Sequence, residues 1–263
     1  MREPVEVHHR VDGGGDRAAL VLSGSLATTL EMWDPQMPSL IERFRVIRYD
    51  LRGHGRSPAG AAPFGVEDLG ADLVGLLDRL GLERAHLCGL SLGGMATMWV
   101  AATAPERVDR LVLCATSTRI GTRQSWGERA AAVRAGGMAS IADTVLGIWF
   151  TPGFRARRAD DLDRFRGMLL STDPDVYAAC CDLLGRTDLA DRLSSIRART
   201  FAIAGSEDPS TPPEHARSLA AGIRGARTAV IDGAAHLVNV ERPAEFDRAV
   251  LTQLLEATPE EER

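Results

Sequence analysis

The chain of 263 residues is predicted to be an α/β protein with a mostly parallel central sheet, helices on both faces of the sheet and an inserted helical cap. Two observations support this fold class. Short apolar runs alternate with segments of helical apolar spacing up to residue 118 and again from residue 196 onwards. Residues 119–195 show helical patterns and no convincing strand. We therefore expect a core of residues 1–118 and 196–263 and a helical cap of residues 119–195.

The expected strands are short and mostly apolar, as strands of a covered parallel sheet are. In chain order they are residues 5–11, 18–22, 45–49, 86–88, 111–115, 200–204 and 228–231.

The expected helices have apolar residues three and four positions apart, and several begin at proline or stop at glycine. They are residues 33–44, 66–80, 93–104, 140–150, 159–170, a helix that opens at 211–213, and 243–255. The charged end of the chain, residues 258–263, is expected to be frayed.

The charge and composition exclude several classes of function. A net charge of −5 argues against a general nucleic-acid surface. No apolar run reaches the roughly 20 residues that span a bilayer, and the first residues contain no signal-peptide core. We therefore expect a cytoplasmic protein without nucleic-acid or membrane partners. All 31 basic residues are arginine, which rules out chemistry that needs a lysine.

The four cysteines indicate neither a metal site nor a disulfide framework. Cys88 and Cys114 lie in apolar strand-like runs, where small buried side chains are expected. Cys180 and Cys181 are adjacent in a helical stretch, and a disulfide between neighbours would be strained. We expect all four to be free thiols.

Ser91 is the main candidate for a nucleophile, because it lies in the motif CGLSLGG at residues 88–94. This G-x-S-x-G pattern follows a predicted strand and precedes a predicted helix. A serine at such a turn is held in strained backbone angles, and the flanking Gly89 and Gly93 relieve crowding. The alternative is a glycine-rich turn without catalytic function.

A serine hydroxyl needs a base to accept its proton and an acid to orient that base. Asp208 and His236 each follow a predicted strand, and ligands collect at the carboxyl ends of parallel strands. We therefore predict a triad of Ser91, His236 and Asp208. Asp232 is the alternative acid, and His54 is expected to have a structural or cleft-lining role. Asp50 is expected to brace its own loop.

The oxyanion of an acyl-transfer reaction needs two N–H donors. One is expected to be the backbone N–H of Leu92, at the positive end of the helix that it begins. The second is expected from the loop after residue 22, where Ser25 is the first choice and Leu26 the alternative. The alternative interpretation is that this loop holds no oxyanion donor and that Gly24 is needed only for the turn.

Several motifs resemble those of the α/β-hydrolase family and, more narrowly, of 3-oxoadipate enol-lactonases. They are MWDPQ (32–36), YDLRGHGRS (49–57), CGLSLGGM (88–95), APER (104–107), TSTRIG (116–121) and WFTPGFR (149–155). The run at 149–155 discriminates best, because caps vary most between subfamilies. Ser23, where many lipases have histidine, also suits enol-lactonases better. The order Ser91, Asp208, His236 is the order of α/β-hydrolase triads.

The resemblance implies the hydrolysis of 3-oxoadipate enol-lactone to 3-oxoadipate, in the β-ketoadipate route of aromatic degradation. The partner would be this small lactone, with no metal or organic cofactor. Trp126, Met138 and Trp149 are candidates for the pocket, and the alternative is that they pack within the cap. The candidates for binding the substrate carboxylate are the cap arginines Arg123, Arg129, Arg134 and Arg186, and the alternative for each is a solvated surface charge.

Other functions remain open on the sequence. One is another serine hydrolase of this fold, such as a carboxylesterase, a C–C hydrolase or a cofactor-free perhydrolase or haloperoxidase. A different class is a ligand receptor that uses the fold without catalysis.

Overall fold

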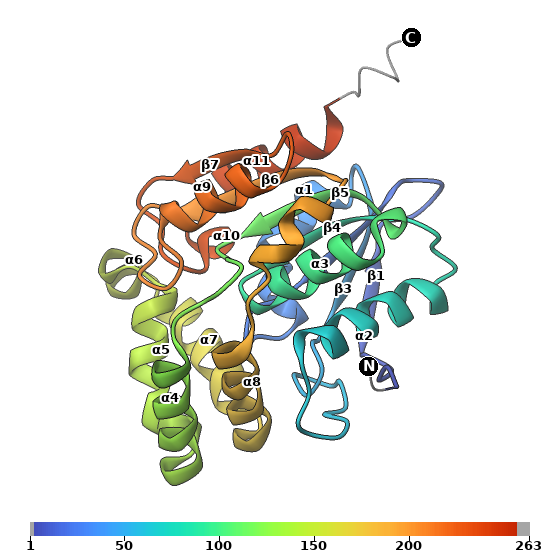
Figure 1. Ribbon diagram of the computed structural model, residues 1–263. Helices are drawn as coiled ribbons and strands as arrows, with labels where there is room; N and C mark the ends of the chain where they lie inside the picture. The colour runs from blue at the N-terminus through green and yellow to red at the C-terminus, as the bar shows by residue number, and fades with distance from the viewer. Residues whose placement is uncertain (1–2, 257–263) are drawn as a thin grey trace.

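The computed structural model describes residues 3–256, which form a central seven-stranded sheet covered by helices (Figure 1). The strand order is β1-β3-β2-β4-β5-β6-β7. The strands are β1 His9–Asp12, β2 Ala19–Ser23, β3 Arg45–Tyr49, β4 Ala85–Leu90, β5 Val108–Cys114, β6 Arg199–Gly205 and β7 Arg227–Ile231. β1 runs antiparallel to β3, and the other neighbouring pairs are parallel, which confirms the predicted sheet.

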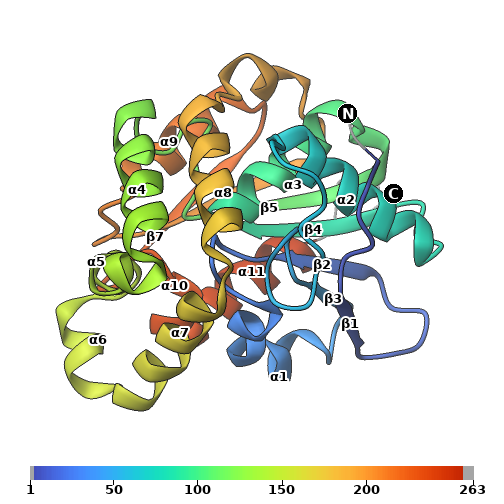
Figure 2. The ribbon, with the colours of Figure 1, turned by 90° about the horizontal axis from the view of Figure 1, so that it is seen from below.

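Helices cover both faces of this sheet, which is why its central strands β2 and β4 are buried along their whole length. One face carries α2 Val66–Arg79, α3 Leu92–Thr103 and α9 Pro213–Gly222. α1 Met37–Leu40 and α11 Pro243–Leu255 pack together on the other face, as the second view shows (Figure 2).

In the described residues, every element between β5 and β6 is helical. These helices gather at one side of the sheet (Figure 1). The longer ones are α4 Arg123–Gly136, α5 Ala142–Trp149, α6 Pro152–Arg157, α7 Ala159–Ser171 and α8 Pro174–Arg186. α4 packs along α8, and α5 packs against α7. We use the name cap for residues 119–195, as a proposed unit.

The segment predicted as one helix, residues 33–44, is broken in the structure. A 3-10 helix covers Leu30–Gln36, and a single α-turn, α1, follows it. Pro35 and Pro38 explain the difference, because proline has no N–H for the helical ladder and crowds the preceding turn.

The first strand also differs from its prediction, since β1 begins at His9 and not at residue 5. Side chains satisfy the preceding backbone instead. The Val5 N–H donates to a carboxylate oxygen of Asp72, and the His8 N–H donates to the Ser57 hydroxyl. These bonds hold the segment on α2 and on the loop after β3.

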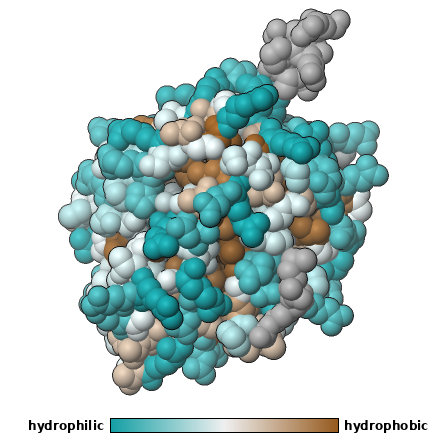
Figure 3. Space-filling model, viewed as in Figure 1, coloured by the Kyte–Doolittle hydropathy of each residue, from teal (hydrophilic) through white to brown (hydrophobic). Residues whose placement is uncertain are grey.

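The four cysteines are free, as predicted, and all four are buried, which was predicted for Cys88 and Cys114. No helix among residues 3–256 is long and apolar enough to cross a bilayer. The predicted fraying of residues 258–263 lies outside the described residues. On the face drawn in Figure 3, hydrophilic side chains cover most of the surface, and the apolar areas between them are small.

Candidate active site

Ser91 occupies a sharp turn between β4 and α3, with φ of 56° and ψ of −117°. Residues other than glycine rarely adopt a positive φ. Neighbouring strands hold this conformation in place. The Ser91 N–H donates to the Cys114 carbonyl at 2.9 Å, and the Thr116 hydroxyl donates to the Ser91 carbonyl at 2.8 Å. The strained backbone is therefore fixed from β5, and the predicted elbow geometry is confirmed.

The glycines around Ser91 are required by close backbone contacts. A Cβ on Gly89 would lie 2.4 Å from the Gly93 carbonyl oxygen. A Cβ on Gly93 would lie 2.4 Å from the carbonyl oxygens of Ser23 and Gly24. Since these contacts are with backbone atoms, a side chain at either position would displace the turn or the loop after β2.

Asp208 and His236 form a buried pair. The His236 Nδ1–H donates to Asp208 Oδ2 at 2.8 Å, and the Thr211 hydroxyl donates to the same oxygen at 2.6 Å. The backbone N–H groups of Ser210 and Thr211 donate to Oδ1. These bonds orient the imidazole with its Nδ1 on the carboxylate.

Two opposing effects set the pKa of Asp208. Burial raises the pKa of this carboxyl, but the charge of His236 and the hydrogen bonds from His236 and Thr211 outweigh burial. Together they lower the pKa to about 2. Asp208 is therefore a carboxylate at neutral pH and can stabilise a protonated His236.

The neighbouring strands β6 and β7 bring these two residues together, although 28 positions separate them. Gly205 and Ile231 pair at the ends of the two strands. A Cβ on Gly205 would lie 2.3 Å from the Ala234 carbonyl oxygen, so the two loops touch. The Glu207 N–H also donates to that carbonyl, at 2.9 Å.

Ser91 and His236 line one cavity beneath the cap, and Asp208 lies behind the histidine. The cavity leaves about 30 Å³ for the centres of water molecules. The described residues that line it are Ser25, Leu26, Ser91, Ile120, Trp126, Arg129, Val145, Ile148, Trp149, Tyr177, Leu184, Ser210 and His236.

Of the predicted pocket residues, Trp126 and Trp149 therefore face the same space as Ser91. Met138 does not belong to the described lining. It is buried in the short 3-10 helix Met138–Ile141, which contacts α4, α5 and α7. The sequence left two roles open for Met138, a place in the pocket or packing within the cap, and its burial in this helix agrees with the second.

The loop after β2 lies against the elbow, where the second oxyanion donor was predicted. The Gly93 N–H donates to the Gly24 carbonyl at 3.0 Å. The Thr28 N–H and hydroxyl both donate to the Ser25 carbonyl, and these two bonds fix the orientation of the peptide unit between Ser25 and Leu26. Leu92 begins α3 directly after Ser91. The N–H groups of Leu92 and Ser25 or Leu26 are thus carried by two backbone segments in contact with each other.

The alternative candidates have other contacts. Asp232 accepts a hydrogen bond from the Ser206 hydroxyl, whereas His236 binds Asp208. His54 is buried and donates through Nδ1 to the Arg52 carbonyl. Asp50 accepts the N–H groups of Leu30 and Arg56, which confirms its loop-bracing role.

Two residues at the site were not anticipated from the sequence. The Thr211 hydroxyl binds Asp208, and a hydroxyl three positions after an acid is the signal that could have indicated it. The carboxylate of Glu241 accepts the N–H and hydroxyl of Thr151 in the cap and the N–H of Ala235, next to His236. Glu241 thereby joins the cap to the histidine loop, a long-range contact without a local signal.

Comparison with known proteins agrees with this geometry. The model of the alpha/beta hydrolase fold matches residues 18–136. The chain is 36% identical to 3-oxoadipate enol-lactonase 2 of Acinetobacter baylyi, over 94% of this chain and 92% of that protein. A crystal structure of the enol-lactonase from Burkholderia xenovorans superposes with a TM-score of 0.94 at 39% identity, over 96% and 97% of the two chains. A Caulobacter protein that carries the name carbamate hydrolase RutD is 31% identical, over 94% and 95%.

The fold, the elbow and these relatives show that the chain belongs to the α/β-hydrolase family. It is an ester hydrolase of that family. The resemblance to 3-oxoadipate enol-lactonases drawn from its motifs is confirmed by relatives that match nearly its whole length.

Proposed function

We propose that the protein hydrolyses 3-oxoadipate enol-lactone to 3-oxoadipate, with Ser91 as nucleophile, His236 as base and Asp208 as the orienting acid. The observation that carries the proposal is the cavity shared by the elbow serine and the carboxylate-bound histidine, in a chain with enol-lactonases among its relatives. The proposed reaction takes place in the cytoplasm, on a small diffusible substrate.

In the first half of the proposed mechanism, His236 Nε2 accepts the proton of the Ser91 hydroxyl as Oγ attacks the lactone carbonyl. The negative charge on the carbonyl oxygen is stabilised by the N–H groups of Leu92 and Ser25. Collapse of this intermediate breaks the bond to the ring oxygen. That oxygen leaves as an enol, protonated by His236, and rearranges to the more stable ketone.

The second half releases the acid from the enzyme. His236 takes a proton from a water molecule, and the oxygen of that water attacks the ester carbonyl of Ser91. The bond to Ser91 Oγ breaks, and His236 returns the proton to this oxygen. Asp208 remains a carboxylate throughout, because its pKa of about 2 keeps it ionised while the histidine cycles.

The test is turnover of the enol-lactone by the purified protein and by its Ser91→Ala variant. We expect hydrolysis by the unmodified protein and loss of nearly all turnover in the variant, with an unchanged circular dichroism spectrum. A fluorophosphonate probe should label Ser91 in the unmodified protein alone. Full activity of the variant would refute the role of Ser91, and absence of lactone hydrolysis would refute the substrate.

Carbamate hydrolysis is the second candidate, favoured by the 31% identity to the Caulobacter protein. Ser91 would attack a carbamate carbonyl in the same way, with His236 accepting its proton, so the site itself does not discriminate between the two substrates. Side-by-side turnover of the enol-lactone and of carbamate, each followed by its own product, separates the two candidates.

A further inference from the structure

The backbone around His236 depends on the cap for part of its hydrogen bonding. His236 lies in the loop of residues 232–237, the histidine loop, between β7 and the short helix α10 Val238–Glu241. The N–H of the next residue, Leu237, donates to the Trp149 carbonyl at 3.0 Å, at the carboxyl end of α5. Leu237 is fully buried, so without this acceptor its N–H would lose a hydrogen bond that water does not replace.

A second connection reaches the residue before His236. The Ala235 N–H donates to one carboxylate oxygen of Glu241, and the other oxygen accepts the N–H and the hydroxyl of Thr151, at 2.9 and 2.8 Å. Hydrogen bonds to a carboxylate are stronger than those between neutral groups. Cap residues 149–151 therefore hold the backbone on both sides of the histidine.

This segment of the cap is itself fixed. Phe150 is fully buried and stacks on Phe154, with ring centroids 4.8 Å apart, and its ring lies 5.2 Å from that of Phe165 in α7. The Thr151 hydroxyl also accepts the Phe154 N–H, where α6 begins. These contacts give the run WFTPGFR at 149–155 a physical role, because they build an aromatic support for the groups that bind the histidine loop.

Neither Thr151 nor Glu241 belongs to the described lining of the Ser91 cavity. Their effect on the reaction would therefore pass through His236, whose Nδ1 bonds Asp208 at 2.8 Å. The imidazole serves as base only while its Nε2 also points at the serine. An error of about 1 Å in such an alignment costs on the order of 100-fold in rate. Small movements of the histidine loop are thus sufficient to slow the reaction strongly.

We propose that Thr151, Glu241 and the Trp149 carbonyl are positioning groups for His236, so that the base is aligned only while the cap segment is bound to the histidine loop. The proposal rests on the proposed function only in that His236 is the base. It gives the cap a role in the chemical step, in addition to enclosing the substrate. Loss of these bonds is expected to lower kcat, whereas loss of a pocket contact would raise KM.

The test is Thr151→Val, which keeps the size of the side chain and removes its hydroxyl. With the enol-lactone and with 4-nitrophenyl acetate, we expect kcat to fall by about 5- to 30-fold, as for loss of a hydrogen bond to a charged group, and KM to stay within about twofold. Thr151→Ser keeps the hydroxyl and should restore kcat. Glu241→Gln should lower kcat in the same way, and the double variant should lose less than the product of the two single effects.

Thr172→Val is the matched control. It is the same substitution at another buried threonine of the cap, whose hydroxyl donates to the Met168 carbonyl one turn earlier, at 3.3 Å. That bond stays within one helix end and does not involve the histidine loop. We expect kcat to remain within about twofold of the unmodified protein.

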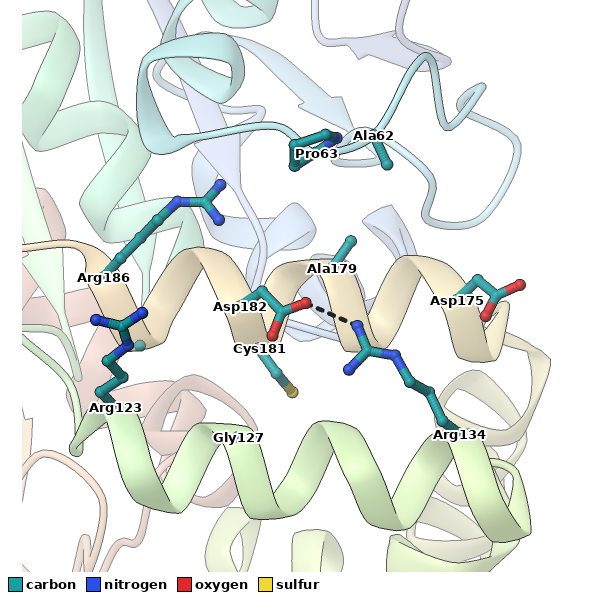
Figure 4. A pocket seen from close by; sticks show the side chains of 11 residues that line it. Ala62, Pro63, Arg123, Gly127, Arg134, Asp175, Ala179, Cys181, Asp182 and Arg186 are labelled. Carbon is teal, nitrogen blue, oxygen red and sulfur yellow. Dashed lines mark hydrogen bonds and ion pairs between the residues drawn. The ribbon is translucent and has the colours of Figure 1, made fainter.

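A second control breaks a polar contact between two cap helices. Arg134 pairs with Asp182 at 2.7 Å, in a groove of about 540 Å³ between α4, α8 and the loop at Pro63 (Figure 4). Arg123 and Arg186 line the same groove. Arg134→Gln removes this exposed pair and should also leave kcat within about twofold. A loss as large as that of Thr151→Val would mean that any weakening of the cap lowers kcat, and would overturn the proposal.

A crystal structure of Thr151→Val separates this inference from the catalytic one. Because kcat scales with the fraction of molecules in which the imidazole is aligned, a tenfold loss leaves the base in place in about one molecule in ten. We expect Nδ1 of His236 to leave Asp208, or the ring to take more than one orientation, even if neither ester is hydrolysed. If Thr151→Val does not fold, Glu241→Gln is judged by the same outcomes. An unmoved imidazole, an unchanged kcat or a rise in KM alone would overturn the proposal.

Discussion

Replacing Asp208 by asparagine tests the triad and its electrostatics together. The change keeps the shape of the side chain but removes the charge that His236 and Thr211 stabilise. The pKa of Asp208 lies at about 2, against an ordinary value of 3.8. That difference corresponds to about 2 kcal/mol of stability when the carboxyl is ionised.

The sign of the pH dependence follows from the lowered pKa. The unfolded chain binds this proton more readily than the folded one, so the contribution is complete above the unfolded value and is lost as pH falls through about 2. Asp208→Asn should therefore destabilise the protein by about 2 kcal/mol at pH 5 and by less than about 1 kcal/mol at pH 2.5. Urea unfolding at the two pH values measures the difference.

Turnover gives a second measurement on the same variant. Without the carboxylate, the imidazole loses its orientation and the stabilisation of its protonated form, so kcat should fall by about two to four orders of magnitude. Asp232→Asn is the control, because Asp232 binds Ser206 and should leave turnover within about twofold. An Asp208→Asn variant with unimpaired kcat, or with the same destabilisation at both pH values, would refute this reasoning.

Three further changes and one control variant probe the elbow and its surroundings. Ser91→Gly should abolish turnover but stabilise the fold by about 1 kcal/mol in urea unfolding, because glycine tolerates the φ of 56°; a less stable variant would contradict the strain. Gly93→Ala should lower kcat at least about tenfold by pushing away the loop after β2. Gly127→Ala is its control, because a Cβ there meets only open space on α4, and it should stabilise the protein by about 0.5–1 kcal/mol. If the two variants changed kcat equally, the close contact of Gly93 with the loop after β2 would not explain the loss. Glu241→Gln should destabilise the protein by about 1–3 kcal/mol in urea unfolding, because the new NH₂ group would face a backbone N–H donor. Unchanged stability would show that Glu241 does not hold the cap to the histidine loop.

The elements that follow from local pattern were predictable. α11 begins and ends at the predicted residues, since Pro243 opens it and its apolar spacing is regular. The glycines of the elbow also follow from local sterics, and the structure has the backbone contacts that require them. Where proline interrupted an apolar pattern, as at Pro35, spacing alone predicted too long a helix.

The contacts between distant segments were harder to predict. The pairing of Asp208 with His236 was predicted because each follows a strand, and the carboxyl ends of parallel strands meet at one edge of the sheet. That rule uses the topology of the sheet and needs no knowledge of side-chain contacts. The same rule does not apply to the cap. Apolar spacing predicts the helices of the cap, but it does not predict how they are oriented on the sheet. Trp126 and Trp149 line the cavity, whereas Met138 is equally apolar but is not among its described lining residues. Which of four arginines faces Ser91 likewise depends on how α4 and α8 are rotated.

The small size of the cavity at Ser91 has a consequence for turnover. Its free space holds about two water molecules, far less than a lactone with a side chain needs. Admission of a substrate of that size therefore requires some of the side chains that line the cavity, such as Trp126 and Trp149, to move. The value of kcat/KM would then depend on how often these side chains move apart as well as on how fast the ester bond is cleaved.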